Sequence, residues 1–278
     1  AAAGATEDGR TGGTAFSGVY IASFAGTGTG PVLMGWLVKD HALRGPLWIC
    51  LAVMAAAALL AATLPGGARR TGPAGKAAGK AAGRAAGSVA LPAGGGWLVY
   101  PAMFLQTFAI GLLSPVVTLY VRDVLGWSAA MFTTLLIFGG GVALVLLPIA
   151  GRLADKAGAA PFLLPGAAAA AAATALFPYA ESGTSLFAAV AAAAAGYALL
   201  IPSWKLQLSR IIPVEGRGSA WGAFLAVEGT GFVLGPVIGG WLWEHAGPGA
   251  PFLASGAALV VFFALLLPIS FRKKVVVR

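Results

Sequence analysis

Long apolar segments are the feature that most constrains how this chain can fold. The 278 residues are 59% hydrophobic and only 10% charged, a balance too apolar for a water-soluble domain. A helix crosses a bilayer with about 20 mostly apolar residues. Segments of this kind lie near residues 14–37, 46–64, 97–120, 129–150, 161–179, 185–203, 218–243 and 251–271. The sequence therefore predicts an all-α polytopic membrane protein with eight transmembrane helices.

The basic residues predict how these helices are oriented. If the N-terminus is cytoplasmic, fifteen of the 18 Lys and Arg fall on the cytoplasmic side, and only Lys39, Arg44 and Arg122 fall outside. Lys and Arg are enriched in cytoplasmic loops, and eight spans with both ends inside is the arrangement that gives this bias. We expect a multi-pass protein of the cell membrane with cytoplasmic N- and C-termini.

One long connection, residues 65–96, divides the predicted helices. It is rich in Gly and Ala and has five basic residues but no acidic one. Glycines disfavour a helix, so we expect a flexible cytoplasmic linker; the alternative is a helix whose Lys76, Lys80 and Arg84 lie on anionic headgroups. The expected domains are a two-span part at 1–64, the linker at 65–96, a six-helix part at 97–271 and a basic cytoplasmic tail at 272–278.

A glycine and proline pattern occurs twice within the apolar segments. The two copies begin at Gly26 and Gly231, and each has glycines four apart, then Pro, then Gly-Trp. Glycines at this spacing share one helix face and let a neighbouring backbone approach closely, while Pro removes a helix hydrogen bond. Each copy is expected to be a helix-packing motif, and the pair indicates two related halves. The motif residues are Gly26, Gly30, Pro31, Gly35, Gly231, Gly235, Pro236 and Gly240.

A short polar connection reads Gly151-Arg152-Leu153-Ala154-Asp155-Lys156-Ala157-Gly158. We expect a tight cytoplasmic turn with a glycine at each end. Gly-x-Leu-Ala-Asp-x-x-Gly resembles the signature loop of the major facilitator superfamily of secondary transporters. The copy at Gly26 resembles a motif on that family's fifth helix, often associated with proton-coupled exporters. The copy at Gly231 then corresponds to the eleventh helix.

The resemblance extends over essentially the whole chain and implies its architecture and mechanism. Segments 14–37 and 46–64 correspond to helices five and six, and the other segments correspond to helices seven to twelve. We therefore expect an incomplete bundle, a fragment or truncated product without the first four helices, whose complete form is a monomer. The resemblance implies transport of a small molecule by alternating access. It also implies that segments 46–64, 161–179 and 251–271 face lipid, which agrees with their near lack of polar side chains.

Glu228 is the most informative single residue. It lies about ten residues into segment 218–243, hence about 15 Å deep at the rise of an α-helix. A carboxyl group at that depth is costly and is a functional candidate. It shares a face with Gly231 and Gly235, and its register partner in the first copy is Ser23. We interpret Glu228 as a candidate for proton coupling or substrate contact; the alternative is a structural hydrogen bond to a neighbouring helix.

Other polar residues receive weaker interpretations. Gln106 lies at similar depth in segment 97–120 and is a candidate substrate contact or a bridge between helices. Trp204 and Lys205 follow segment 185–203 and are expected to anchor its cytoplasmic end at the membrane interface. Cys50 is the only cysteine, and neither histidine has a second ligand at metal spacing, so we expect no metal site and no cofactor.

The preferred function is proton-coupled efflux of a drug-like or metabolite molecule. Its expected partners are the substrate, protons and the lipid bilayer, and the scattered basic residues do not indicate nucleic acid binding. The alternatives are an uptake member of the same superfamily, a truncated remnant that transports nothing, and a membrane domain that binds lipid or a partner. An enzyme is not expected, because no phosphate-binding loop or catalytic set is present.

Overall fold

The computed structural model describes residues 98–180, 182–211 and 217–271, together with Ser17, Ile21, Trp48, residues 51–56 and Leu59. The expected spans 14–37 and 46–64, the linker and the basic tail lie outside the described residues apart from these few. Residues 51–56 form a short exposed helical segment, which belongs to a compact unit separate from the one that contains residues 98–271.

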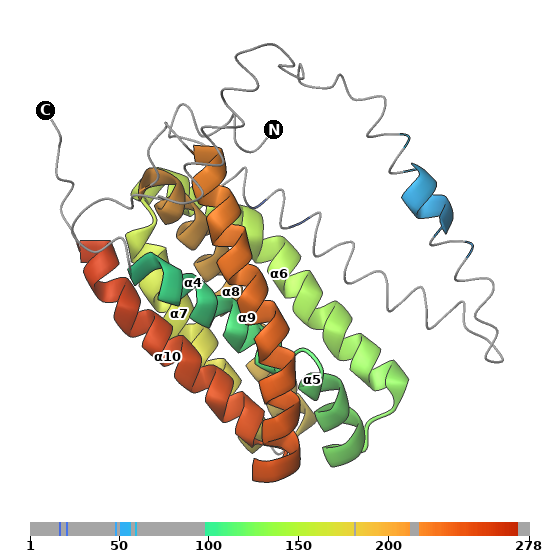
Figure 1. The fold of residues 1–278 in the computed structure, drawn as a ribbon. Helices are drawn as coiled ribbons and strands as arrows, with labels where there is room; N and C mark the ends of the chain where they lie inside the picture. The colour runs from blue at the N-terminus through green and yellow to red at the C-terminus, as the bar shows by residue number, and fades with distance from the viewer. Residues whose placement is uncertain are drawn as a thin grey trace, which may run out of the picture. The chain divides into compact units, whose positions relative to one another are not determined.

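The described part of this unit is entirely helical (Figure 1). Six stretches are long and apolar enough to cross a membrane, and they match the six segments expected after the linker. The helices are α4 (Val99–Leu113), α5 (Val116–Leu119), a π-helical turn (Tyr120–Val124), α6 (Ala129–Ala157), α7 (Ala160–Leu176), a 3₁₀ turn (Phe177–Tyr179), α8 (Gly183–Ile211), α9 (Arg217–Ala246) and α10 (Ala250–Phe271).

Local sequence signals set several of these helix ends. The Ser128 Oγ accepts a hydrogen bond from the Met131 backbone N–H at 3.3 Å and caps α6. Ser182 does the same at the start of α8, where the Ser185 N–H donates to its Oγ at 3.1 Å. Gly158 ends α6 with φ 90°, a conformation that costs glycine nothing. These signals separate neighbouring apolar segments into distinct antiparallel helices.

Helix α4 is central, with α9 on one side and α10 on the other, and α7 joins α10 to α8, which in turn packs on α6. Contacts between α4 and α9 ascend in both helices, from the Tyr100–Phe224 ring pair to the Gly111–Gly235 approach. The two helices therefore run parallel. This agrees with segments 97–120 and 218–243 both running outward from the cytoplasm.

Close backbone approaches hold α4 against α9. A Cβ added to Gly231 would lie 2.2 Å from the Thr107 Oγ1, and one added to Gly235 would lie 2.6 Å from the Gly111 Cα. Gly239 makes the third approach, 2.2 Å from the Leu112 carbonyl oxygen, whereas a Cβ at Gly240 meets nothing within 4 Å among the described residues. The contact thus follows i, i+4, i+8 spacing, and the packing role expected for Gly240 belongs to Gly239.

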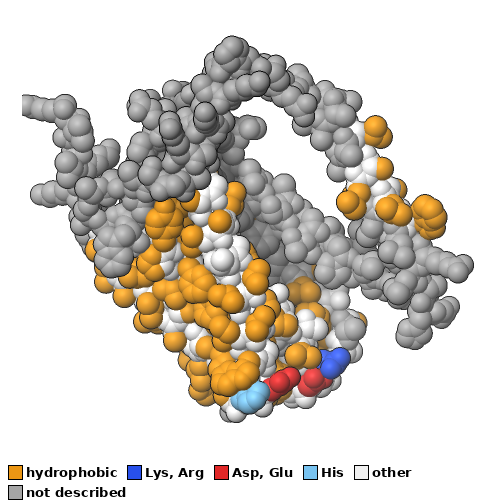
Figure 2. All heavy atoms as spheres, in the orientation of Figure 1, with side chains coloured by type: hydrophobic (Ala, Val, Ile, Leu, Met, Phe, Trp, Pro, Cys, Tyr) orange, Lys and Arg blue, Asp and Glu red, His pale blue; other side chains and the backbone are white. Residues whose placement is uncertain are grey.

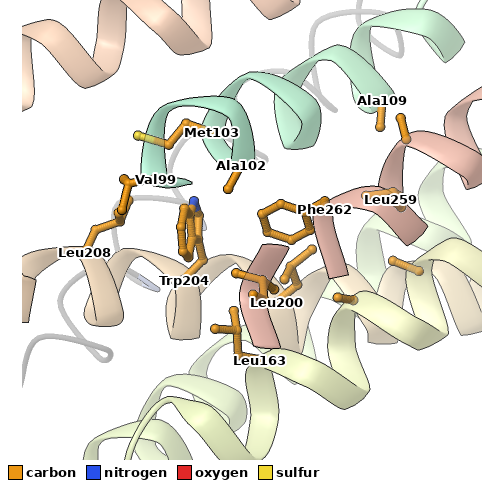
Figure 3. Close-up of a cluster of buried hydrophobic side chains, with 14 of the residues drawn as sticks. Val99, Ala102, Met103, Ala109, Leu163, Leu200, Trp204, Leu208, Leu259 and Phe262 are labelled. Atoms are coloured by element: carbon orange, nitrogen blue, oxygen red, sulfur yellow. The ribbon is translucent and has the colours of Figure 1, made fainter. Parts of the chain in front are cut away.

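The main hydrophobic core lies where α4, α7, α8 and α10 meet (Figure 3). Trp204 is fully buried there and packs edge to face on Phe262, with ring centroids 5.6 Å apart. Ser255 of α10 donates a 2.8 Å hydrogen bond to the Ala109 carbonyl of α4. Trp204 is therefore part of the protein interior, and its expected role as an interfacial anchor is wrong.

The described structure buries α7 and α10, two of the helices expected to face lipid, to the same degree as α4. In the most apolar 18-residue stretches of α7 and α10, 44% of residues are buried, as in α4, whereas α6 buries only 11%. A helix that is apolar all round suits either lipid or protein neighbours, so composition alone could not separate them. Exposed apolar side chains lie along α6 at Ile137 and Val145, along α9 at Val233 and Val237, and along α10 at Val260.

Hydrophobic side chains cover the sides of the bundle, and charged side chains gather at one end (Figure 2). This is the distribution expected of a structure with its sides in hydrocarbon and its end in water. Ser17, one of the few described residues before the bundle, donates its hydroxyl to the Leu147 carbonyl of α6 at 2.9 Å.

We predict that Gly235→Ala destabilises the bundle by about 1–3 kcal/mol, because the added methyl group overlaps the Gly111 backbone and forces α4 from α9. Gly240→Ala is the matched control: it has room for the methyl group and is expected to gain about 0.5–1 kcal/mol from helix propensity. Unfolding titrations with SDS in mixed micelles measure both. Equal stabilities for the two variants would contradict the close approach.

Candidate functional site

A buried ion pair joins α8 to α9. The Lys205 Nζ donates a hydrogen bond to the Glu228 Oε1. The side chains keep only 6% and 12% of their exposure, respectively. Glu228 thus has an opposite charge as its partner, and the sequence reasoning, which considered proton coupling, substrate contact or a hydrogen bond, did not identify it.

Lys205 reaches Glu228 because α8 continues to Ile211, eight residues beyond the segment expected from hydropathy. The predicted interfacial anchor is wrong for Lys205, whose residue exposure is 5%. A signal was present in the sequence: Lys205 and Glu228 flank the same short connection at residues 212–216 and carry opposite charge. An intramembrane charge is expected to have such a partner.

A row of three aromatic rings begins beside the pair at Trp221. The Lys205 Nζ lies 5.8 Å from the ring centroid of Trp221, within the range of a cation–π contact. Trp221 packs edge to face on Phe224 at 6.0 Å, and Phe224 does so on Tyr100 of α4 at 5.7 Å. These three rings form a wall, here called the aromatic wall, beside the two charges.

Several buried polar atoms near α8 and α4 have no hydrogen-bond partner among the described residues. They include the Trp204 Nε1, the Ser203 Oγ and the Gln106 Oε1. Gln106 is 3% exposed and so lies inside the bundle, as its depth in the sequence suggested. Buried polar groups are normally paired with protein or ordered water, so this part of the bundle has hydrogen-bonding capacity to spare.

The connection at 151–158 is mostly helical. Gly151, Arg152, Asp155 and Lys156 all lie in the last turns of α6, and only Gly158 turns the chain. The expected tight turn with a glycine at each end is therefore wrong for Gly151, which is buried in the helix. Ala154 and Ala159, on either side of Gly158, pack with Leu206, the neighbour of Lys205. The connection thus contacts the turn of α8 that carries the buried lysine.

The remaining candidates do not extend this site within the described residues. Ser23, Gly26, Gly30, Pro31 and Gly35 lie outside them. Arg122 and Asp123 form an exposed pair with each other at the end of the π-helical turn, with 2.6 Å between Nε and Oδ1. The described part of the chain contains no group of three or more metal-ligating side chains.

A double-mutant cycle tests the pair as a unit. A lone charge left in a low-dielectric interior costs several kcal/mol, whereas an apolar pair of similar volume is close to neutral. We predict that Lys205→Met or Glu228→Leu alone destabilises the protein by about 3–5 kcal/mol and that the double variant recovers most of this loss.

The exposed pair supplies the matched control for this cycle. Arg122→Gln and Asp123→Asn are expected to change stability by about 1 kcal/mol or less, since a solvated pair contributes little. SDS unfolding titrations measure all variants. Additive effects at Lys205 and Glu228 would show that the two charges do not depend on each other.

Comparisons with known proteins place the chain in a family. The family model described as Major Facilitator Superfamily matches residues 99–277. A relative named "Proton-coupled antiporter flippase LtaA" from Staphylococcus saprophyticus is 25% identical over 186 residues, which cover 63% of this chain and 45% of the relative. Proteins of the same name from Staphylococcus aureus are 26% identical over 156 residues, covering 51% of this chain and 37% of each relative.

The chain spans less than half the length of these curated relatives. The match to the family model begins at the first helix of the described bundle and continues past its last. The chain belongs to the Major Facilitator Superfamily.

Proposed function

We propose that this chain carries the proton-linked part of a secondary transporter, in which Glu228 accepts and releases the coupled proton. The observation that carries the proposal is the buried pair of Glu228 with Lys205. A carboxylate held in the bundle interior by a single cation is stable only while the cation stays, so a proton and the cation compete for it. Protonation of Glu228 therefore provides two states of different helix contact between α8 and α9.

The packing suggests how such a change is transmitted. Between Gly231 and Gly239, helix α9 contacts α4 mainly through glycines, and surfaces of small residues permit sliding. Leu206, beside Lys205, packs on both ends of the turn at Gly158. We propose that Gly151, Arg152, Asp155, Lys156 and Gly158 form the conformational motif, and that Gln106 contacts substrate through its unpaired Oε1.

The proposal includes the setting of the whole protein. It is a multi-pass protein of the cell membrane with both termini cytoplasmic, and it works as a monomer by alternating access between two halves. Residues 1–64 form part of the first half, and 65–96 form the cytoplasmic linker. The role is transport rather than catalysis, since the family is one of transporters.

One candidate for the mode of coupling is exchange, in which substrate leaves the cell as protons enter. The relatives are named proton-coupled antiporters, and the glycine-proline pattern of the first copy agrees with this mode. Exchange requires that substrate binding drive the proton from Glu228. Substrate and proton then each lower the affinity of the protein for the other.

The test uses proteoliposomes that hold the protein and a pH-sensitive dye. A gradient of benzenesulfonate or of benzyltrimethylammonium is imposed, and the pH inside the liposomes is followed. We expect one probe to drive protons across the membrane, and Glu228→Gln to reduce this movement by at least about 100-fold, as loss of a proton-transfer group does.

Glu244→Gln is the matched control, because Glu244 is on the same helix but exposed near its outer end. It should leave the proton movement unchanged. Proton movement by Glu228→Gln at the rate of the unaltered protein would refute Glu228 as the coupling group. Absence of any flux from the 278-residue chain would favour the non-transporting remnant.

A further inference from the structure

We propose that Lys205 is the recognition residue for an organic anion, which binds in the same step as a proton on Glu228. The inference rests on the proposed function, because it assumes that Glu228 takes up the coupled proton. It adds the chemical class of the substrate and the direction in which substrate and proton change each other's affinity. Its basis is the juxtaposition of one buried cation, one buried carboxylate and a wall of aromatic rings.

The charge balance of the site limits what can bind there. The pair of Lys205 and Glu228 has no net charge, and both side chains are nearly enclosed by protein. A proton on Glu228 neutralises the carboxylate and leaves the lysine as an isolated cation, which costs several kcal/mol in this environment. An anion that binds to the Lys205 Nζ restores a net charge of zero. The empty pair and the site loaded with proton and anion are thus both neutral.

Among the residues that the structure describes, Glu228 is the carboxylate paired with Lys205. Tyr100 is the only titratable residue of α4, and α7 and α10 contain neither acidic nor basic residues within their helical bounds. The charged residues of α6 near this end are Arg152, Asp155 and Lys156, in its last turns. Of these neighbours only Asp155 is acidic, and it lies beside two cations in the chain.

This balance fixes how proton and substrate affect each other. An anion and the ionised Glu228 compete for the same cation, so anion binding increases the affinity of Glu228 for a proton, and by linkage the proton increases the affinity for the anion to the same degree. A cationic substrate would instead compete with the proton and be repelled by Lys205. The geometry therefore favours joint binding of an anion and a proton over exchange of a cation for a proton.

The surroundings define the rest of the ligand. Trp221, Phe224 and Tyr100 present ring faces and edges beside the charges, which suits an aromatic or aliphatic body. The Trp204 Nε1 and the Ser203 Oγ are also buried donors without an acceptor among the described residues, but successive positions of a helix face different directions, so they lie on other faces of α8 than Lys205. The indole nitrogen of Trp204 points toward α4 (Figure 3). The oxygens of a carboxylate, sulfonate or phosphate accept hydrogen bonds of the kind that the Lys205 Nζ donates.

The experiment measures proton uptake during anion binding. Benzenesulfonate, which stays ionised, is titrated into the detergent-solubilised protein in weakly buffered solution with a pH indicator. We expect net uptake approaching about one proton per bound anion where the pair is ionised. Benzenesulfonamide, its neutral analogue, should neither bind comparably nor move protons.

Three variants separate the roles of the two charges. Glu228→Gln leaves a permanently unpaired cation and should bind benzenesulfonate without proton uptake. The double variant Lys205→Met, Glu228→Gln has no buried charge, so it remains a folded control, and its binding should be weaker by about tenfold or more. Arg122→Gln removes an exposed cation and should bind like the unaltered protein.

Proton release on binding of benzenesulfonate, no binding by the unaltered protein, or equally tight binding by the double variant would each overturn the role of Lys205. Tight binding of benzyltrimethylammonium with proton release would assign the site to cations and favour exchange. These failures are distinct from failure of the proposed function, which is decided by proton movement in liposomes that hold Glu228→Gln.

Discussion

The high free-energy cost of a lone charge inside an apolar bundle is the constraint on which this account depends. Glu228 and Lys205 are each too costly to bury alone, and the structure places them together between α8 and α9. If either residue loses its charge, the other is left as an unpaired charge inside the bundle. A helix bundle with otherwise apolar contacts at this level thereby gains one contact whose strength depends on the proton concentration, which is the property that a coupled transporter needs.

The arrangement of the helices around this pair suits movement. Glycines bring α9 onto the backbone of α4 over two turns, so the two helices share a smooth surface. The large side chains, with Trp204 and Phe262 among them, lie in the core formed by α4, α7, α8 and α10. The core of large side chains and the glycine contact that permits sliding thus lie on different sides of α4. The pair connects these two sides, because Lys205 belongs to the same turn of α8 as Trp204 whereas Glu228 belongs to α9.

The sequence predicted the membrane class, the six spans after the linker and the parallel direction of α4 and α9, because hydropathy and the distribution of basic residues act over whole segments. It also singled out Glu228, since a carboxyl group deep in a span is rare. It failed on features that depend on helix ends and on neighbours. Hydropathy ended segment 185–203 at the membrane limit, whereas α8 continues to Ile211 and carries Lys205 into the interior. The pattern match chose Gly240, whereas strict four-residue spacing from Gly231 leads to Gly239. Apolar composition did not reveal that α7 and α10 are buried to the same degree as α4.

The protonation state of Glu228 is the quantity at the centre of the account, and infrared difference spectroscopy observes it most directly. Spectra of the purified protein are compared before and after addition of a saturating ligand, with Glu228→Gln as the assignment control. The account predicts that the carboxylate bands of Glu228 are replaced by the carbonyl band of a protonated carboxylic acid when benzenesulfonate binds, and that this change is absent from the variant. A Glu228 that stays ionised while the anion is bound would contradict the account.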